Sequence, residues 1–287
     1  MIAIFKREFK SYFTGTVGFI FVAIVLAFMG LFATGLHLLN GLASFEYSLQ
    51  SAVIVYLPAI PILTMRSLTE DKRMRTDRLL YSLPLKASHI IVGKYLAMLA
   101  VLAIPTAIVA LYPLILGAFG RVNFVSAYAC LFAFFMLGAA LISLCMFLSS
   151  LAETQIIAAI LGFGASFFLF MAKSIATMIP TSATVSFVCF GIVGIVIALI
   201  AFYLSKNIPI ACAVGGICLL PTLLVFLISP ETFEGKFPAL LTTLALFGRF
   251  DTFSYGIFDI STLVLYISVA IFFVVLTVLA AEKKRWD

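Results

Sequence analysis

The chain has 287 residues, of which 64% are hydrophobic and only 10% charged, and its formal net charge is +6. A soluble domain has about 45–50% apolar and about 25% charged residues, so no soluble core could bury this excess. The composition excludes a soluble domain and indicates an integral membrane protein. The positive charges fall in the loops, where they fit membrane topology and contact with anionic lipids rather than nucleic-acid binding.

Long apolar runs predict an all-α, polytopic membrane helix bundle. A spanning helix needs about 20 mostly apolar residues, and in hydrocarbon its backbone groups must pair within the segment. Eight runs meet this requirement, and a count of six stays open because the stretch from Thr177 to Pro230 is ambiguous. The expected spans are Thr16–Leu39, Ser48–Met65, Ile90–Phe119, Phe124–Ser149, Gln155–Ile179, Ser186–Leu204, Pro209–Ile228 and Thr262–Ala281.

The distribution of Lys and Arg predicts that both ends of the chain lie in the cytoplasm. Cytoplasmic loops carry an excess of these residues. With the N-terminus inside, 14 of the 18 lie on cytoplasmic segments. The other four are Arg121, Lys173, Lys236 and Arg249. The opposite orientation would reverse this ratio, and two cytoplasmic ends require an even number of spans.

Residues 1–15 predict an interfacial elbow helix ahead of the first span. Apolar residues recur at helical spacing on one face, and basic residues lie towards the other. The apolar set is Ile2, Phe5, Phe9, Tyr12 and Phe13, and the basic set is Lys6, Arg7 and Lys10. The apolar run that follows is too long for the core of a signal peptide. A plain juxtamembrane anchor is the alternative to an elbow.

Two longer hydrophilic segments connect the spans, residues 66–89 inside and residues 229–261 outside. Within the first, Thr76–Leu83 is predicted to be a short helix, with Thr76 as its N-cap and Pro84 as its stop. Its leucines would form an apolar face, and such a face on a cytoplasmic helix needs a partner or packs back on the bundle. In the second, Pro238–Phe250 is apolar enough to form a helix or a re-entrant segment.

Several chemistries have no signature in this sequence. There is no P-loop, zinc-protease or serine-hydrolase motif. The five cysteines lie in apolar runs without metal-ligand spacing, so we expect them to be buried and reduced. Only Lys173 is expected at membrane depth, whereas ion-coupled transporters place acidic or His residues there. We therefore expect no catalytic residue and no metal site in this chain.

The loop after the second span has a distinctive pattern of residues. It contains Glu70-Asp71, Arg75-Thr76-Asp77-Arg78-Leu79-Leu80, Leu83-Pro84 and Gly93-Lys94. This pattern resembles the permease subunits of type-2 ABC exporters, which tend to show there an acidic pair, a Gly-Thr-acidic-x-Leu-Leu run, a Pro, and a Gly-Lys that opens the third span. Arg75 stands where glycine is usual.

Further stretches are similar to the branch of this family that includes gliding-motility permeases. They are Pro58–Arg66, Ser149–Gln155, Arg249–Asp259 and Lys284–Trp286. The resemblance covers nearly the whole chain and implies a single transmembrane permease domain, residues 1–287. It departs from the family over residues 186–228, because typical members have six spans and this region looks like an added hairpin.

The resemblance implies a subunit of a larger complex in the cytoplasmic membrane of a bacterium. The permease would pair with a second permease, identical or related, and with two ATPase subunits that bind ATP and Mg²⁺, so that this chain itself would hold no cofactor. The ATPase would dock on the loop helix, with the turn at residues 149–155 as a second contact. The docking residues so implied are Glu70, Asp71, Thr76, Asp77, Arg78, Leu79, Leu80, Leu83, Pro84 and Glu153.

Two other functions stay open on the sequence alone: a stand-alone secondary transporter or channel, and a membrane scaffold or sensor that transports nothing. A neighbouring gene for a P-loop ATPase would favour the exporter, and its absence would favour the others. The sequence does not specify the substrate, because peptides, lipids and small drugs all suit an apolar interface without charges.

Overall fold

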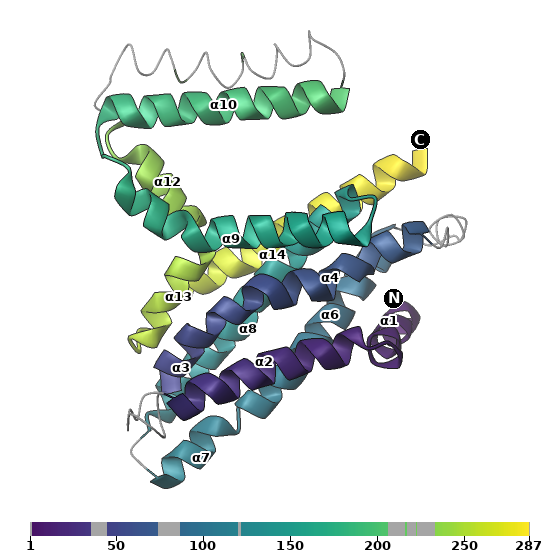
Figure 1. Ribbon diagram of the computed structural model, residues 1–287, viewed down its shortest axis with the longest axis vertical. Helices are drawn as coiled ribbons and strands as arrows, with labels where there is room; N and C mark the ends of the chain where they lie inside the picture. The colour runs from purple at the N-terminus through teal and green to yellow at the C-terminus, as the bar shows by residue number, and fades with distance from the viewer. Residues whose placement is uncertain are drawn as a thin grey trace. The chain divides into compact units, whose positions relative to one another are not determined.

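The computed structural model describes residues 2–35, 45–73, 87–119, 122–205, 216, 222 and 233–286 (Figure 1). Every regular element in these residues is a helix, which confirms the predicted all-α class. The chain divides into two compact units. The first comprises Met1–Phe168 and Arg249–Asp287, and the second comprises Leu169–Gly248.

Mostly long helices form the first unit. In chain order they are α1 (Ile2–Thr14), α2 (Val17–Ala33), α3 (Phe45–Ala52), a 3₁₀ turn at Val53–Val55, α4 (Tyr56–Arg73), α6 (Ala87–Val109), α7 (Tyr112–Phe119), α8 (Phe124–Leu151) and α14 (Ile260–Trp286). The helix α9 (Gln155–Met178) begins in this unit, and α13 (Leu246–Ser254) ends in it.

Five helical segments in the described residues are long and apolar enough to cross a membrane. They are Phe45–Glu70, Ala87–Ala118, Phe124–Leu151, Gln155–Met178 and Ile260–Glu282. A sixth is added if α1 and α2, which meet at 71°, count as one broken span. The predicted span Ser186–Leu204 coincides with the helix α10 (Ala183–Ser205), and Pro209–Ile228 lies outside the described residues. The count of eight therefore stays a prediction.

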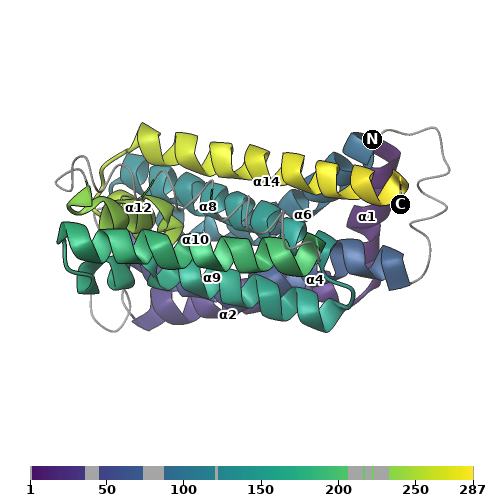
Figure 2. The same cartoon turned by 90° about the horizontal axis from the view of Figure 1, so that it is seen from above.

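The helix α8 is the centre of the first unit. In the most apolar 18-residue stretch of α8, 72% is buried inside the structure. The corresponding share is 28% for the spans that contain α6 and α9, and 22% for α14. The helices α3, α4, α6 and α14 pack against it, and Figure 2 shows α14 running along it. The ring of Tyr56 stacks on that of Phe134 at 4.4 Å, and its hydroxyl donates to the Phe134 carbonyl at 3.3 Å. The buried Tyr56 hydroxyl thus finds an acceptor inside an apolar core.

Helices pack closely at this centre because small residues allow it. A Cβ at Gly138 of α8 would lie 2.7 Å from Leu102 Cδ2 and 3.1 Å from the Tyr56 hydroxyl. Glycine is therefore required there for α4, α6 and α8 to meet. Two turns before Leu102 in α6, Tyr95 donates its hydroxyl to the carbonyl of Ala139 at 3.1 Å, which adds a polar link between α6 and α8.

The third predicted span is interrupted at one proline only. The helix α6 continues through Pro105 without a break, whereas the chain leaves the α-helix at Ala110 and Leu111, just ahead of Pro113 in α7. A proline has no N–H to donate, and its ring clashes with the carbonyl four residues earlier, here that of Val109. Pro113 therefore accounts for the separation of α6 from α7.

The second unit packs the end of α9, the helix α10 and the helix α12 (Lys236–Leu244) around aromatic side chains. Phe190 of α10 meets Phe237 of α12 edge to face at 5.2 Å. Gly235 enters α12 with a φ of +66°, a conformation that favours glycine. The predicted helical character of Pro238–Phe250 is confirmed as two short helices, α12 and the start of α13. Lys173 is exposed and lies against Gly248.

Candidate functional site

The structure describes only part of the predicted docking set. Glu70 lies in the last turn of α4, and the backbone of Asp71 continues that helix towards Arg73. Glu153 lies between α8 and α9. The remaining residues lie outside the described part of the chain, so the loop helix stays a prediction: Thr76, Asp77, Arg78, Leu79, Leu80, Leu83 and Pro84.

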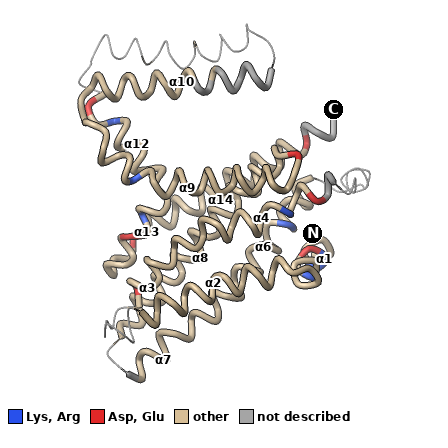
Figure 3. The backbone as a smooth tube through the Cα atoms, viewed as in Figure 1, with Lys and Arg blue, Asp and Glu red and all other residues tan. Residues whose placement is uncertain are grey.

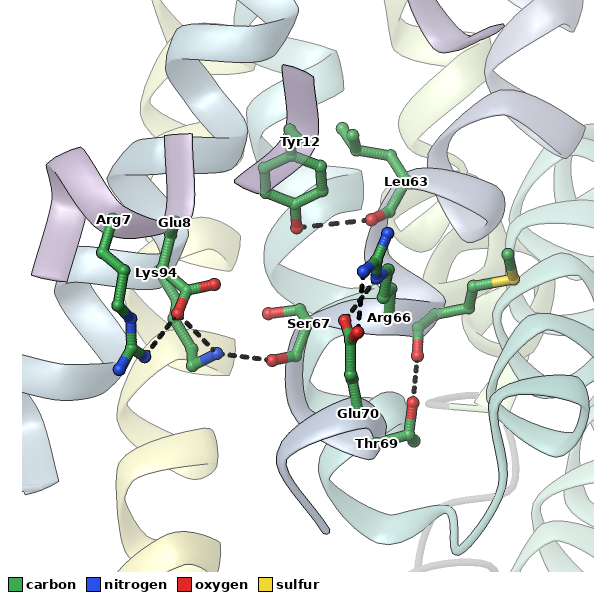
Figure 4. Close-up of polar contacts among 10 residues, drawn as sticks. Arg7, Glu8, Tyr12, Leu63, Arg66, Ser67, Thr69, Glu70 and Lys94 are labelled. Carbon is green, nitrogen blue, oxygen red and sulfur yellow. Dashed lines mark hydrogen bonds and ion pairs between the residues drawn. The ribbon is translucent and has the colours of Figure 1, made fainter. Parts of the chain in front are cut away.

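A buried lysine lies beside the two ends of that loop. Lys94, in the second turn of α6, is only 2% exposed. Its Nζ donates to the carbonyl of Ser67 in α4 at 2.7 Å and lies 3.3 Å from Glu8 Oε1 of α1 (Figure 4). A buried ammonium group is tolerated only when a charge partner and hydrogen bonds compensate for its lost hydration. The three groups therefore join α1, α4 and α6 at one point.

Glu8 is the acidic member of this junction. Its side chain is 14% exposed, and Oε1 also accepts from Arg7 Nη2 at 2.7 Å. The family pattern pointed to Gly93-Lys94, but sequence reasoning assigned no role to Glu8 or Ser67. One signal was present: Lys94 is a charged residue near the start of an otherwise apolar run, where a pairing partner is expected.

Glu70 has a local partner, as the sequence allowed, but it is Arg66 and not the expected Arg73 or Arg78. Arg66, one turn earlier in α4, donates to both carboxylate oxygens of Glu70, with Nη2 at 2.7 Å from Oε1. This two-pronged geometry orients both side chains. The pair is about one-third exposed, so its contribution to stability is small. Its role is to position Glu70 at the end of α4.

The elbow helix α1 packs through a line of residues four apart. Ile4 contacts Ile90 of α6, Glu8 pairs with Lys94, and Tyr12 donates to the carbonyl of Leu63 in α4 at 3.4 Å. Tyr12 therefore belongs to the packed face, not to the membrane face predicted for it. Ile2 is 73% exposed.

The aromatic residues of α1 form a separate row. Phe5, Phe9 and Phe13 are half-buried, and the centroids of neighbouring rings lie 6.0 and 5.1 Å apart.

At the bend into α2, a Cβ at Gly18 would lie 2.7 Å from the Tyr12 carbonyl oxygen. Glycine at this position allows the chain to turn tightly from α1 into α2.

The turn between α8 and α9 is short and exposes its side chains. Thr154 accepts from the backbone N–H of Ile157 at 3.3 Å and so caps α9. Leu151 is 54% exposed, Ile156 is 73% exposed, and Glu153 between them is exposed too. Two large apolar side chains beside a carboxylate form a small surface suited to a protein contact.

The model of the ABC-2 family transporter proteins matches residues 36–185, which is just over half of the 287 residues. The chain belongs to the ABC-2 transporter family. No curated protein and no solved structure matches it. The chain is therefore a membrane permease component of an ABC transporter, a class that works with an ABC ATPase.

The matched region of this ABC-2 permease contains α3 to α9 and the predicted docking loop. It ends at residue 185, next to the stretch 186–228 that was expected to depart from the family. The resemblance to the gliding-motility branch rests partly on Arg249–Asp259 and Lys284–Trp286, which lie outside the match, and it stays a prediction.

At the other end of the first unit, acidic residues of the permease have structural partners. Asp251 accepts from Gln50 Nε2 of α3 at 3.0 Å. Asp259 caps α14, accepting from the N–H of Ser261 at 2.9 Å and from the hydroxyl of Thr262 at 2.6 Å. The Thr262 hydrogen bond is the main cause that lowers the pKa of Asp259 below its usual value. Among the described residues, no group of three His, Cys, Asp or Glu is placed to hold a metal ion.

Proposed function

We propose that this chain is the permease subunit of an ATP-driven exporter in the cytoplasmic membrane of a bacterium. The observation that carries the proposal is the junction at Lys94. The helices α4 and α6 lead into and out of residues 74–86, and Lys94 ties both of them to α1. Because this contact joins the helices at both ends of the loop to α1, it is suited to pass a movement of a partner bound at the loop on to α1.

The ATPase docks on the predicted helix Thr76–Leu83, with Leu79, Leu80 and Leu83 entering an apolar groove of the partner. Glu70, fixed by Arg66, lies beside this helix in sequence and presents a carboxylate to basic groups of the ATPase. The exposed turn around Glu153 makes the second contact. ATP and Mg²⁺ are bound by the partner, because this sequence has no P-loop.

Closure of the ATPases shifts the loop, and the junction carries the shift into the bundle. The ion pair of Lys94 with Glu8 and the hydrogen bond to Ser67 make the end of α4, the start of α6 and the elbow move together. The elbow continues through a tight bend into α2. A displacement at the membrane surface therefore reaches the first span directly.

Two permeases and two ATPases form the working complex, and the substrate leaves along the interface between the permeases. The exposed apolar flanks of the spans suit an apolar or amphipathic cargo. For example, Ile156, Ile160 and Phe167 of α9 are 73%, 65% and 47% exposed. Peptides, lipids and small drugs all meet this description.

Co-purification tests the docking. A tagged chain is expected to bring down an ABC ATPase, and Leu79→Asp with Leu80→Asp is expected to abolish both this association and substrate export. The control is Leu244→Asp, which places the same charge on a 46% exposed leucine of α12. If the double variant keeps its ATPase and its export, the docking assignment is wrong. If the purified chain transports without any ATPase, it is a stand-alone transporter.

A further inference from the structure

The connection between α13 and α14, residues 255–260, exposes large apolar side chains. The start of α8 lies beside it, because a Cβ at Gly256 would lie 3.3 Å from the Ser126 hydroxyl oxygen. Large apolar side chains are exposed there too, at the same end of the first unit. The exposed residues are Tyr255, Ile257, Phe258 and Ile260 of the connection and Phe124, Val125 and Tyr128 of α8.

The connection has little that would favour contact with bulk water. Asp259 is its one charged residue, and the carboxylate is engaged by the N–H of Ser261 and the hydroxyl of Thr262. Tyr255, Ile257 and Phe258 are each more than half exposed. A cluster of large apolar side chains is rarely left in contact with water unless it binds a partner or a membrane.

The backbone of the connection does not suit the hydrocarbon core either. Gly256 has a φ of +77°, which ends the helical path of α13. Among residues 255–259, all of which the structure describes, only Gly256 and Ile257 donate their N–H groups to backbone carbonyls. Open N–H and C=O groups are not found facing lipid tails, because nothing there can pair with them. The connection is therefore too apolar for water and too open for hydrocarbon.

The length of α14 places this connection at a boundary of the bilayer. Its apolar segment Ile260–Glu282 has 23 residues, about 34 Å at 1.5 Å per residue. The hydrocarbon layer is roughly 30 Å thick, so each end of the segment lies at one boundary. No charged residue stands between Ile260 and Ala281, as the tan tube of α14 in Figure 3 shows. Figure 2 shows that α14 starts at the end of the unit opposite to α1.

The exposed surface continues from the connection along one face of α14. Val264, Ile267 and Ile271 follow Ile260 at helical spacing, and all four are exposed. The exposed face of a span contacts lipid tails, so the connection is the continuation of a lipid-facing stripe at its outer end.

We propose that the α13–α14 connection lies in the lipid interface of the leaflet opposite to α1, with Tyr255, Ile257 and Phe258 among the glycerol and carbonyl groups of the phospholipids. Tyrosine and other amphipathic aromatic residues gather at this depth. Apolar side chains reach the acyl chains there, while open backbone groups bond to water and lipid carbonyls. The contact fixes the end of α13 and the start of α14 at the membrane surface, and it is separate from the ATPase-docking loop.

Fluorescence quenching by nitroxide-labelled phosphatidylcholine measures this depth. Trp286 is the only tryptophan, so Trp286→Phe gives a dark background. Tyr255→Trp and Phe258→Trp then place probes in the connection, and Ile271→Trp, about 16 Å further along α14, is the matched control near the bilayer centre. The proteins are reconstituted in vesicles whose nitroxide lies either near the acyl carbonyl group or near the end of the acyl chain, and aqueous iodide reports exposure to water.

The carbonyl-level nitroxide is expected to quench both connection probes about twofold more than the chain-end nitroxide, with the reverse preference at Ile271→Trp. Equal quenching by the two nitroxides, or a preference for the chain end at both connection probes, would overturn the proposal. So would quenching by iodide alone, which would place the connection in water. Probes that no quencher reaches would overturn it too, because protein, such as a second copy of the chain, would then cover the connection.

A charge change tests whether the apolar side chains hold the connection in place. With the Tyr255→Trp probe, Ile257→Asp plus Phe258→Asp is expected to lower quenching by the carbonyl-level nitroxide about twofold and to raise quenching by iodide. Thr242→Asp plus Thr243→Asp adds the same charge at exposed positions of α12 and should change neither. If the Ile257 and Phe258 changes also leave both unchanged, these side chains do not insert into the interface.

Discussion

Lys94 of α6 and Glu8 of α1 form an ion pair across the membrane-surface end of the first unit, with Nζ and Oε1 3.3 Å apart and Lys94 only 2% exposed. The pair joins residues 86 positions apart in the sequence, and it does so beside both ends of the predicted docking loop. Together with the Ile4–Ile90 and Tyr12–Leu63 contacts, it holds the elbow to α4 and α6.

Breaking this pair is expected to destabilise the protein and uncouple it. Glu8→Gln leaves the Lys94 ammonium without its charge partner and should cost about 1–3 kcal/mol, measured as thermal unfolding of the detergent-purified chain. Arg7→Gln, which removes a half-exposed partner of the same carboxylate, should cost under about 0.5 kcal/mol.

The double variant Glu8→Gln with Lys94→Met separates the interaction from the individual losses. We expect it to be less destabilised than the sum of the single variants by about 1 kcal/mol or more, since both ends of one contact are removed. Strictly additive costs would mean that the two side chains do not stabilise each other. In the assembled transporter, the single variants should also lose substrate stimulation of ATP hydrolysis while keeping the ATPase bound.

The bend between α1 and α2 depends on the absence of a side chain at Gly18. Gly18→Ala places a Cβ 2.7 Å from the Tyr12 carbonyl oxygen, a backbone atom that cannot move aside, so a loss of about 1–3 kcal/mol is expected. Gly164→Ala in α9 is the control, because no atom lies within 4 Å of the added Cβ. A Gly18 variant as stable as the Gly164 variant would contradict the tight bend.

The orientation of the chain is open to direct measurement. After replacement of the five native cysteines, a single Leu80→Cys should react with a membrane-impermeant maleimide only from the cytoplasmic side. Tyr255→Cys, at a 68% exposed position after α13, should react only from the other side. Labelling of position 80 from outside would overturn both the predicted topology and the docking of the ATPase.

Asp259 should make stability depend on pH in the acidic range. Its pKa is lower in the folded state, so its charged form contributes stability that is fully present above the unfolded value of about 3.9 and is lost as pH falls through the folded value. Asp259→Asn keeps an acceptor for the cap but does not titrate. The difference in melting temperature between this variant and the parent should shrink as the pH is lowered from 7 to 3.

The structural role of the same residue is tested by Asp259→Ala, which should cost about 1 kcal/mol because α14 loses its N-cap. If the alanine and asparagine variants are equally stable at every pH, the hydrogen bonds to Ser261 and Thr262 do not stabilise the helix.

Hydropathy by itself determined the class of the protein and most of its helices. A run such as Phe124–Ser149 has only one stable form in hydrocarbon, and α8 begins at Phe124 and ends at Leu151 as that argument requires. The loop pattern around Glu70 and Gly93-Lys94 likewise indicated the family, because it is a local sequence signal.

Only the tertiary structure decided which of these residues meet. No local pattern shows that Glu8 reaches Lys94 or that Tyr12 turns towards Leu63, because each contact depends on how α1 folds back on α4 and α6. The same holds for the exposed faces of the spans, since Leu96 and Ile271 look alike in sequence whether they face lipid or protein. Lys94 itself stood out in the sequence as a charge near the start of an apolar run. Only the packing of α1, α4 and α6 shows that it is the centre of the junction.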